Sequence, residues 1–600
     1  MTPPTVTNDA APEVRGLYKR WPAPLPILDD AGEIEKLART LKVAPLVAQL
    51  LHQRGLTDAD QARRFFDPKL TDLHDPRQLP GCERAADRLV NAVRSRESIV
   101  IYGDYDVDGV TATTILYHVL KTADPDANVR CYVPHRIDEG YGINAESLET
   151  LAEEGAALIV SVDCGITAVE PAKIAAELGL DLIITDHHEI GETLPDCYAL
   201  VHPRLPGEDG KYYPFCELCG AGVAYKLAWQ IARAWCGSDR VTTELRTALV
   251  NVLPFAALGT IADVVPLVDE NRTIARYGLQ RVKQTPNVGL NALIDASRLR
   301  DEKIDAYHVG FVLGPRLNAC GRMGHAREAV RLLTDATPDE AAEIAEFLNA
   351  ENDRRRATER KIVESAKEQV TTCGYDSNDV RAIVLADADW HQGVVGIVCS
   401  RLVETFGRPC VLMNITDGQA HGSARSIDGF NIYDAFCACR EHLTTFGGHA
   451  MAAGLRLPTE NLDAFRNALV AYTNEQLSVE DLTPVLRIDA DTTVGDLTQG
   501  VVEQINRLAP FGRSNPTPIV RINNVQLDQS ARVMGAGGKH INFTVREGRA
   551  SLRCIGWSMG DLCPRLPAGV HVDLVGEPNL NHFNGRTSVQ LTLKDLRIRG

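Results

Sequence analysis

The stretch Ile101-Tyr-Gly-Asp-Tyr-Asp-Val-Asp-Gly-Val110 carries three aspartates, Asp104, Asp106 and Asp108, spaced two residues apart. An apolar run, residues 98–102, precedes them, and a helix-like stretch, residues 110–118, follows. A buried strand that ends in clustered carboxylates places several negative charges at one rim of a sheet. Because such charges repel one another unless cations neutralise them, the stretch predicts a divalent-metal site. An acidic surface turn is the alternative interpretation for this motif taken alone.

Two more apolar runs end at side chains that commonly bind metals. Residues 157–162 lead into Asp163, and residues 181–185 lead into Asp186-His187-His188. Helical patterns separate the runs, and this alternation predicts an α/β fold with a parallel, doubly wound sheet. In such a sheet ligands bind outside the carboxyl ends of the strands, so we expect these side chains to share one site.

A fourth apolar element, residues 255–262, leads into Asp263-Val-Val-Pro266, and we interpret it as a further strand end. Carboxylates with one or two imidazoles suit Mn²⁺ or Mg²⁺ better than structural Zn²⁺. Five or six ligands exceed what one ion needs, so two ions, about 3.5–4 Å apart and sharing a carboxylate, are expected. Such a site predicts hydrolysis of a phosphoester or phosphoanhydride bond.

These four motifs resemble those of the DHH phosphoesterase superfamily. The chain is similar, from about Ala44 to its end, to the bacterial RecJ family within it. Four further stretches carry that similarity: Gly314-Pro-Arg-Leu-Asn-Ala-Cys-Gly-Arg322, Trp390-His-Gln-Gly-Val-Val-Gly396, Phe446-Gly-Gly-His-Ala-Met-Ala-Ala-Gly454 and Pro510-Phe-Gly-Arg-Ser-Asn-Pro516. The resemblance implies a metal-dependent 5′→3′ exonuclease that degrades single-stranded DNA to mononucleotides in DNA repair and recombination.

The resemblance also implies two α/β lobes, a DHH domain and a DHH-associated domain, joined by a long helix and followed by an OB-fold β-barrel. An unbroken helical pattern at residues 338–370 and short alternating strands after residue 485 fit this organisation. The expected segments are a helical lead-in (1–93), the DHH domain (94–290), a helical connector (291–375), the DHH-associated domain (376–484) and the OB-fold (485–600).

Matched residue by residue, the resemblance assigns roles at the predicted centre. Asp163 is the expected bridge between two ions. Asp104 is a further ligand or orients a water, His188 contacts the scissile phosphate or the attacking water, and Asp186 orients the histidines. The implied metal ligands are Asp106, Asp108, Asp163, His187 and Asp263.

The expected substrate-binding residues lie elsewhere in the chain. Arg136, Tyr141, Ser423 and Arg425 resemble residues that recognise a strand end, since an arginine fork holds a terminal phosphate with two hydrogen bonds. We expect His449, in a glycine-rich segment, to reach a phosphate oxygen. Three residues are expected to line the path of the strand: Arg316, Asn318 and Arg322.

Length and composition restrict the class of protein. Six hundred residues are too many for a single hydrophobic core, and the N-terminal stretch has no apolar signal segment. Fifteen scattered cysteines fit a reducing cytoplasm, and the Cys216/Cys219 pair lacks the second pair of a zinc ribbon. The net charge of −17 argues against general nucleic-acid binding, but residues 520–600 hold eleven Lys/Arg against six Asp/Glu.

In that basic segment, arginines interleaved with Phe543, Trp557 and Phe583 suit a single strand that stacks on aromatic rings. Aromatic side chains that fill the barrel core are the alternative. The expected partner is single-stranded DNA with a 5′ end; a single-strand-binding protein and a helicase stay open as further partners, and no membrane is expected. The role of the Arg513-Ser514 pair, where relatives often have glycines, stays open.

Two other functions compete with this one. A DHH phosphodiesterase for oligoribonucleotides, cyclic dinucleotides or pyrophosphate would need neither a long connector nor a barrel. A catalytically inactive replication scaffold would be expected to lack metal ligands, yet all are present.

Overall fold

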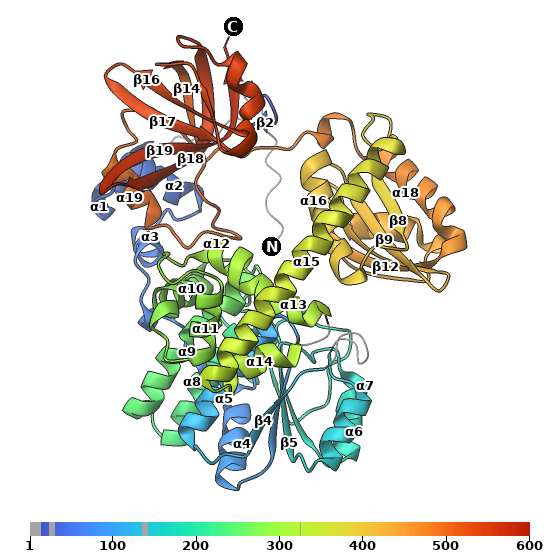
Figure 1. Ribbon diagram of the computed structural model, residues 1–600. Helices are drawn as coiled ribbons and strands as arrows, with labels where there is room; N and C mark the ends of the chain where they lie inside the picture. The colour runs from blue at the N-terminus through green and yellow to red at the C-terminus, as the bar shows by residue number, and fades with distance from the viewer. Residues whose placement is uncertain (1–13, 23–30, 135–141, 324–325, 600) are drawn as a thin grey trace. The chain divides into compact units, whose positions relative to one another are not determined.

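The structure, a computed structural model, describes residues 14–22, 31–134, 142–323 and 326–599 (Figure 1). It divides into two compact units, one of residues 63–354 and 509–516, the other of residues 1–62, 355–508 and 517–600. We call the first the sheet unit; the second contains a mixed-sheet lobe and a barrel. The units do not follow the five predicted segments one for one, so the predicted bounds stay predictions.

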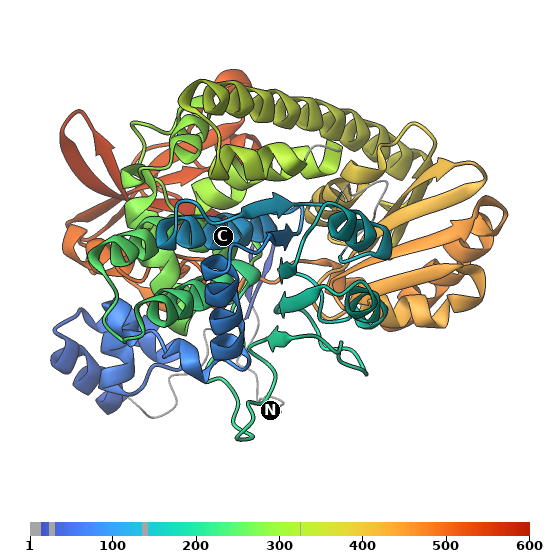
Figure 2. The same ribbon diagram turned by 90° about the horizontal axis from the view of Figure 1, so that it is seen from below.

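The sheet unit is built on five parallel strands in the order β4-β3-β5-β6-β7. Helices cover both faces, as Figures 1 and 2 show. Strands buried on both faces carry continuous apolar runs, and the predicted doubly wound sheet is confirmed. The strands are β3 (Ile99–Gly103), β4 (Val129–Tyr132), β5 (Leu158–Val162), β6 (Asp181–Thr185) and β7 (Ala199–Val201).

One face of this sheet packs against α6 and α7, and the other packs against α4, α5 and α8. Asn144 caps α6, because its side chain accepts a hydrogen bond from the backbone N–H of Ser147 at 2.8 Å. The helices are α4 (Cys82–Arg94), α5 (Val107–Ala123), α6 (Ala145–Glu153), α7 (Val169–Glu177) and α8 (Gly220–Cys236).

The element before Asp263 is a helix, α9 (Thr243–Ala262), so the interpretation of residues 255–262 as a strand end is wrong. A short apolar run does not distinguish a buried strand from part of a buried helix. Among the described residues, α9 is the one helix with the length and hydropathy to cross a membrane, but two thirds of it is buried. It packs against α5 and α10 (Asp269–Arg281), as expected of a core helix.

The predicted long helix is present as α15 (Pro338–Thr372), which at 1.5 Å per residue is about 52 Å long. The other helices of the sheet unit precede it in the chain. They are α11 (Val288–Ala296), α12 (Ala306–His308), a π-helical turn (Val309–Leu313), α13 (Gly314–Met323) and α14 (Ala326–Thr334).

The mixed-sheet lobe has the strand order β11-β12-β10-β9-β8, with β8 and β9 parallel and the others antiparallel. The glycine-rich segment forms the hairpin of β11 and β12, so His449 lies on a strand at the sheet edge. The elements are β8 (Ile383–Asp387), α16 (Gln392–Phe406), β9 (Cys410–Thr416), β10 (Gln419–Arg425), α17 (Ile432–Ala438), β11 (Thr445–His449), β12 (Ala452–Pro458) and α18 (Leu462–Gln476).

The predicted barrel closes through a pairing of β14 with β16, in addition to the order β14-β18-β19-β17-β16. Phe543 lies in its core, whereas Trp557 and Phe583 are 52 % and 69 % exposed. The elements are β13 (Ala490–Thr492), α19 (Gln499–Asn506), β14 (Val520–Leu527), β15 (Arg532–Met534), β16 (His540–Glu547), β17 (Ala550–Gly556), β18 (His571–Phe583) and β19 (Arg586–Ile598).

The lead-in is only partly helical. The helices α1 (Ala31–Leu41), α2 (Pro45–Gln53) and α3 (Ala59–Phe66) are present, and the Asp58 side chain caps α3. Before them, however, β1 (Val14–Arg15) and β2 (Arg20–Trp21) form a hairpin whose buried Trp21 donates to Asp595 of β19 at 3.0 Å. The sequence analysis did not predict this hairpin, because two-residue strands leave no periodic pattern.

Candidate metal centre

The turn between β3 and α5 places the first three aspartates. Asp106 is the N-cap of α5, and its Oδ1 accepts from the backbone N–H groups of Asp108 and Gly109 at 2.8 and 3.1 Å. A Cβ at Gly109 would lie 2.7 Å from the backbone nitrogen of Asp104, so glycine is required there. The repeated Asp-x-Asp-x-Asp-Gly pattern thus folds into a helix start that turns its carboxylates inward.

Asp108 is buried and is held by the start of a second helix. Its two carboxylate oxygens accept from the backbone N–H groups of Gly220 and Ala221 at 2.6 and 2.8 Å. Burial, and next the charge of Asp106, raises the pKa of Asp108 to about 6 although these hydrogen bonds lower it. The role of Gly220 and Ala221 was missed, because the only signal was a Gly-Ala-Gly helix start 112 residues away.

Asp163 follows β5 in a left-handed backbone conformation with φ of 63°. A Cβ at Gly220 would lie 2.5 Å from its Oδ1, so the close approach of α8 to Asp163 requires glycine. Burial raises the pKa of the Asp163 carboxyl well above its usual range, and the charges of Asp108 and the neighbouring aspartates add to this effect.

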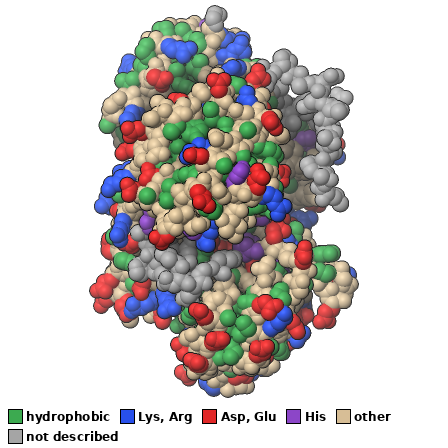
Figure 3. Space-filling view, turned by 90° about the vertical axis from the view of Figure 1, so that its right-hand side faces the viewer, with side chains coloured by type: hydrophobic (Ala, Val, Ile, Leu, Met, Phe, Trp, Pro, Cys, Tyr) green, Lys and Arg blue, Asp and Glu red, His purple; other side chains and the backbone are tan. Residues whose placement is uncertain are grey.

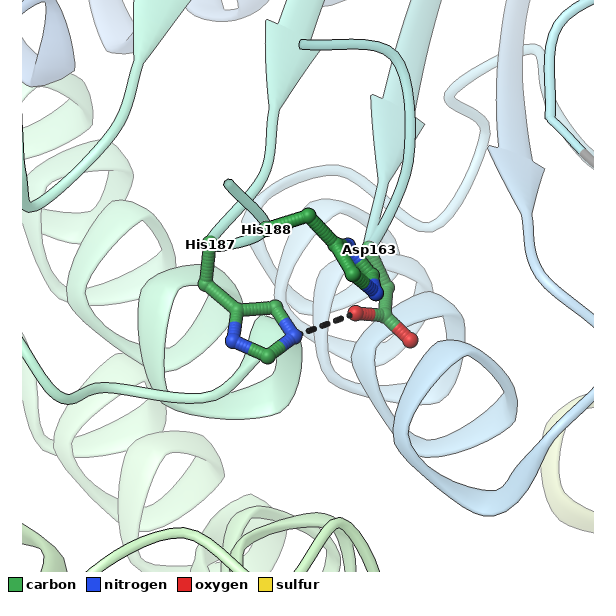
Figure 4. Close-up of side chains that lie close together, drawn as sticks. All are labelled: Asp163, His187 and His188. Carbon is green, nitrogen blue, oxygen red and sulfur yellow. Dashed lines mark ion pairs between the residues drawn. The ribbon is translucent and has the colours of Figure 1, made fainter. Parts of the chain in front are cut away.

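His187 lies among three of these carboxylates, and Figure 4 shows its ring directed toward Asp163. Its Nε2 is 3.1 Å from Asp163 Oδ1, 3.7 Å from Asp263 Oδ2 and 3.8 Å from Asp108 Oδ2. Burial lowers its pKa, which favours the neutral imidazole that binds metals. Asp263 is the C-cap of α9, and burial and the charge of Asp108 raise its pKa to about 7.

His188 is in hydrogen-bond contact with Asp186. Its Nδ1 lies 2.7 Å from Asp186 Oδ1, an oxygen that also accepts from the backbone N–H groups of both histidines. Burial opposes the charged imidazole, but the hydrogen bond to Asp186 and the charge of Asp186 raise the pKa of His188 to about 9. Its side chain is 45 % exposed, so a substrate has access to it.

Three groups of side chains offer ligand atoms that lie within 4.8 Å of one another. Asp163 belongs to two of these groups, and His187 to two. Five buried or half-buried carboxylates cannot all be charged without cations between them, and Asp163 Oδ1, although buried, accepts no hydrogen bond from any described residue. Oxygen donors with imidazole fit Mn²⁺ or Mg²⁺. The groups are Asp163, His187 and His188; Asp108, His187 and Asp263; and Asp104, Asp106 and Asp163.

The predicted strand-lining residues lie on α13. Arg316 is 8 % exposed; its Nε donates to Asn349 at 3.0 Å and its Nη1 to the carbonyl of Val312 at 2.8 Å. Asn318 accepts from the backbone N–H of Val107 at 3.0 Å, so it braces the aspartate-bearing turn. The side chain of Arg322, and all of Arg136 and Tyr141, lie outside the described residues. Contact of these residues with a strand stays a prediction.

Cys216 and Cys219 do not form a metal site with any described residue. Cys219 is buried as the N-cap of α8, where its sulfur accepts from the backbone N–H of Gly222 at 3.3 Å, whereas Cys216 is exposed. Neither belongs to a group of ligand-type side chains.

The raised pKa values predict how the metal-free protein responds to pH. Asp108 and Asp263 keep protons to about pH 6 and pH 7 when folded, whereas unfolded aspartate releases them at about 3.9. The folded form then binds more protons, so its free energy of unfolding falls as pH rises through this window. Divalent ions replace these protons. We expect the Tm difference between protein in Mn²⁺ and protein in EDTA to grow from pH 5 to pH 8. In Asp263→Asn this difference should grow less steeply with pH. A Tm difference that does not depend on pH would contradict the metal centre.

Three family models match the chain: the DHH family N-terminal domain at residues 98–254, the DHHA1 domain at residues 379–475 and the RecJ OB domain at residues 488–595. The chain is 42 % identical to the single-stranded-DNA-specific exonuclease RecJ of Bacillus subtilis, over 96 % of this chain and 71 % of that protein. It is 34 % identical to the protein of that name from Dickeya dadantii, over 92 % of this chain and 96 % of that one.

Two solved structures also resemble this chain over almost its whole length. The crystal structure of RecJ in complex with Mn²⁺ from Thermus thermophilus has a TM-score of 0.79 at 30 % identity, and covers 97 % of this chain and 79 % of that one. The Mg²⁺ complex from the same organism has a TM-score of 0.73 at 28 % identity, with coverage of 97 % and 78 %.

Proposed function

This chain belongs to the RecJ family, and on that premise we propose that it is a metal-dependent exonuclease that degrades single-stranded DNA. One observation carries the proposal: three ligand groups, linked to one another through Asp163 and His187, lie at the carboxyl end of a parallel sheet. The same arrangement supports the proposed ligands Asp106, Asp108, Asp163, His187 and Asp263. Because Asp104 offers its oxygen alongside Asp106 and Asp163, we propose it as a sixth ligand.

The residues around the metal centre have different proposed roles. A pair of Mn²⁺ or Mg²⁺ ions bound there would lower the pKa of a water and neutralise charge on the phosphate oxygens. Asp163 is positioned to touch both ion positions, because it belongs to two ligand groups. His188, held by Asp186 and charged at neutral pH, can donate a proton toward the departing oxygen of the scissile phosphodiester.

The 5′→3′ polarity requires a group that recognises the strand end, and we propose Ser423 and Arg425 on β10 for this role. A Cβ at Gly396 would lie 3.2 Å from Ser423 Oγ and 3.4 Å from Arg425 Nη2, so the first turns of α16 lie against both side chains. The N-terminus of a helix favours a phosphate, and an arginine adds charge and donors. His449, exposed at the edge of the same sheet, is proposed as a further phosphate contact.

The barrel is proposed to hold the strand. On its outer face, Thr544, the exposed Arg553 and Gln590 form one cross-strand row on β16, β17 and β19. Trp557 follows β17, and its ring meets that of His540 edge-on at 4.8 Å. An exposed indole and an exposed arginine, four residues apart along the chain, suit a stacked base and a phosphate contact.

The charge of the whole chain is compatible with such a partner. On the face shown in Figure 3, Lys and Arg are interspersed with Asp and Glu, so that face does not present one sign of charge.

All fourteen described cysteines are free thiols, which supports the cytoplasm as the proposed compartment. A single-strand-binding protein and a helicase are proposed as partners on the family resemblance alone.

The most direct test is digestion of end-labelled DNA. We expect the wild-type protein to degrade single strands but not duplexes in Mn²⁺ or Mg²⁺, and to be inactive in EDTA. Asp163→Ala is expected to lose hydrolysis, since it removes a ligand from two groups, while metal-free binding of single strands changes little. Substantial activity of a folded Asp163→Ala protein would refute the two-metal centre.

A second prediction concerns the charge of His188. In Asp186→Asn, the pKa of His188 is expected to fall from about 9 toward its ordinary value of about 6.5, because the partner charge is gone. The alkaline limb of kcat/KM, measured in Mg²⁺, should then move to lower pH. Asp196→Asn, at an exposed aspartate, serves as the control. An unmoved limb would exclude His188 as the acid.

A third prediction concerns end recognition. Arg425→Ala is expected to cost about 1.5–3 kcal/mol, a charge-assisted hydrogen bond, in kcat/KM on 5′-phosphorylated strands. Strands with a 5′-hydroxyl end should lose much less. Arg440→Ala, an exposed arginine of the same lobe, should change neither. Equal losses on both substrates would show that Arg425 does not recognise the end.

A further inference from the structure

A loop far along the sequence packs against the segment that follows a metal ligand. Residues 509–516, Ala-Pro-Phe-Gly-Arg-Ser-Asn-Pro, belong to the sheet unit, although residues 508 and 517 on either side belong to the other unit. This loop contains the Arg513-Ser514 pair whose role the sequence left open.

The loop contacts the turn directly after Asp263. The backbone N–H of Leu267 donates to the carbonyl of Arg513 at 2.8 Å, and Arg513 Nη1 donates to the carbonyl of Val264 at 3.4 Å. A Cβ at Gly512 would lie 2.7 Å from Leu267 Cδ1, so the loop backbone rests on this side chain. The loop therefore holds both ends of the turn formed by residues 264–267.

The loop itself is braced. Asn515 is fully buried, and its Nδ2 donates to the carbonyl of Pro510 at 2.8 Å. Gly512 and Asn515 exchange two backbone hydrogen bonds of 2.9 and 3.1 Å. Arg272, buried on α10, donates from Nη2 to the carbonyl of Ala509 at 3.1 Å. A loop fixed in this way can determine the position of what it touches.

Asp263 needs such support more than Asp106 and Asp108 do. Asp106 and Asp108 each accept two backbone N–H hydrogen bonds, which fix their carboxylates. The carboxylate of Asp263 accepts no hydrogen bond from the described residues; it meets His187 Nε2 at 3.7 Å, and its side chain is 25 % exposed. Its position is therefore set by the backbone at the end of α9 and by the turn that follows.

We propose that residues 509–516 are a positioning element for Asp263, which holds its carboxylate against His187 and Asp108 and so sets the affinity of one of the two ions. The inference rests on the proposed metal centre. It assigns the loop an effect on the ion to which Asp263 contributes, with Asp108, His187 and the shared Asp163, and none on the ion held by Asp104, Asp106 and Asp163.

Two variants of the full chain loosen the loop without touching a ligand. Asn515→Ala removes the internal brace, and Gly512→Val pushes the loop away from Leu267. Calorimetric titration with Mn²⁺ is expected to show two binding steps in the wild type and one step weakened about tenfold in each variant, the usual size of the effect when a residue behind a ligand is lost. The other step, and single-strand binding in EDTA, should stay as in the wild type.

Leu293→Ala is the control for general destabilisation, because Leu293 is fully buried on α11. It should lower Tm as the loop variants do and leave both Mn²⁺ steps unchanged. The inference is overturned if both loop variants bind Mn²⁺ like the wild type, or if Leu293→Ala weakens the same step. If the wild type itself binds no Mn²⁺, the metal centre is wrong and this inference falls with it.

Discussion

The mutual repulsion of carboxylates gathered at one rim of a parallel sheet is the constraint on which the rest of this structure depends. Asp108 and Asp163 are almost completely buried, and burial raises the pKa of both. Without cations, such carboxyl groups bind protons and stay neutral. Divalent cations let them stay charged, and a charged, preorganised ligand set is what hydrolysis of a phosphodiester requires.

In the surrounding fold, fixed dipoles and close backbone contacts offset this repulsion. The starts of two helices point toward the cluster: α5 is capped by Asp106, and α8 donates two N–H groups to Asp108. Glycines at positions 109 and 220 let backbone approach Asp104 and Asp163 more closely than any side chain would permit. His188 lies beside this centre with its own anion, Asp186, which raises the pKa of this imidazole, whereas burial lowers the pKa of its neighbour, His187.

Much of the candidate site could be predicted from the sequence, because most of its ligands directly follow the end of a strand. Apolar β-branched runs end at Asp104, at Asp163 and at Asp186, and the parallel sheet brings such ends together whatever the distance along the chain. What could not be predicted depends on contacts between distant segments. The apolar run before Asp263 is helical because α5 and α10 bury it, which composition does not reveal. The N–H groups of Gly220 and Ala221 reach Asp108 across 112 and 113 residues, and the loop at Arg513 reaches Val264 across 249.

The central claim is that two divalent cations share Asp163. Anomalous diffraction from crystals of the full chain grown with Mn²⁺ tests it most directly. We predict two manganese peaks, about 3.5–4 Å apart, each bonded to a different oxygen of Asp163. A single peak, or two peaks of which one is not bonded to Asp163, would contradict the account.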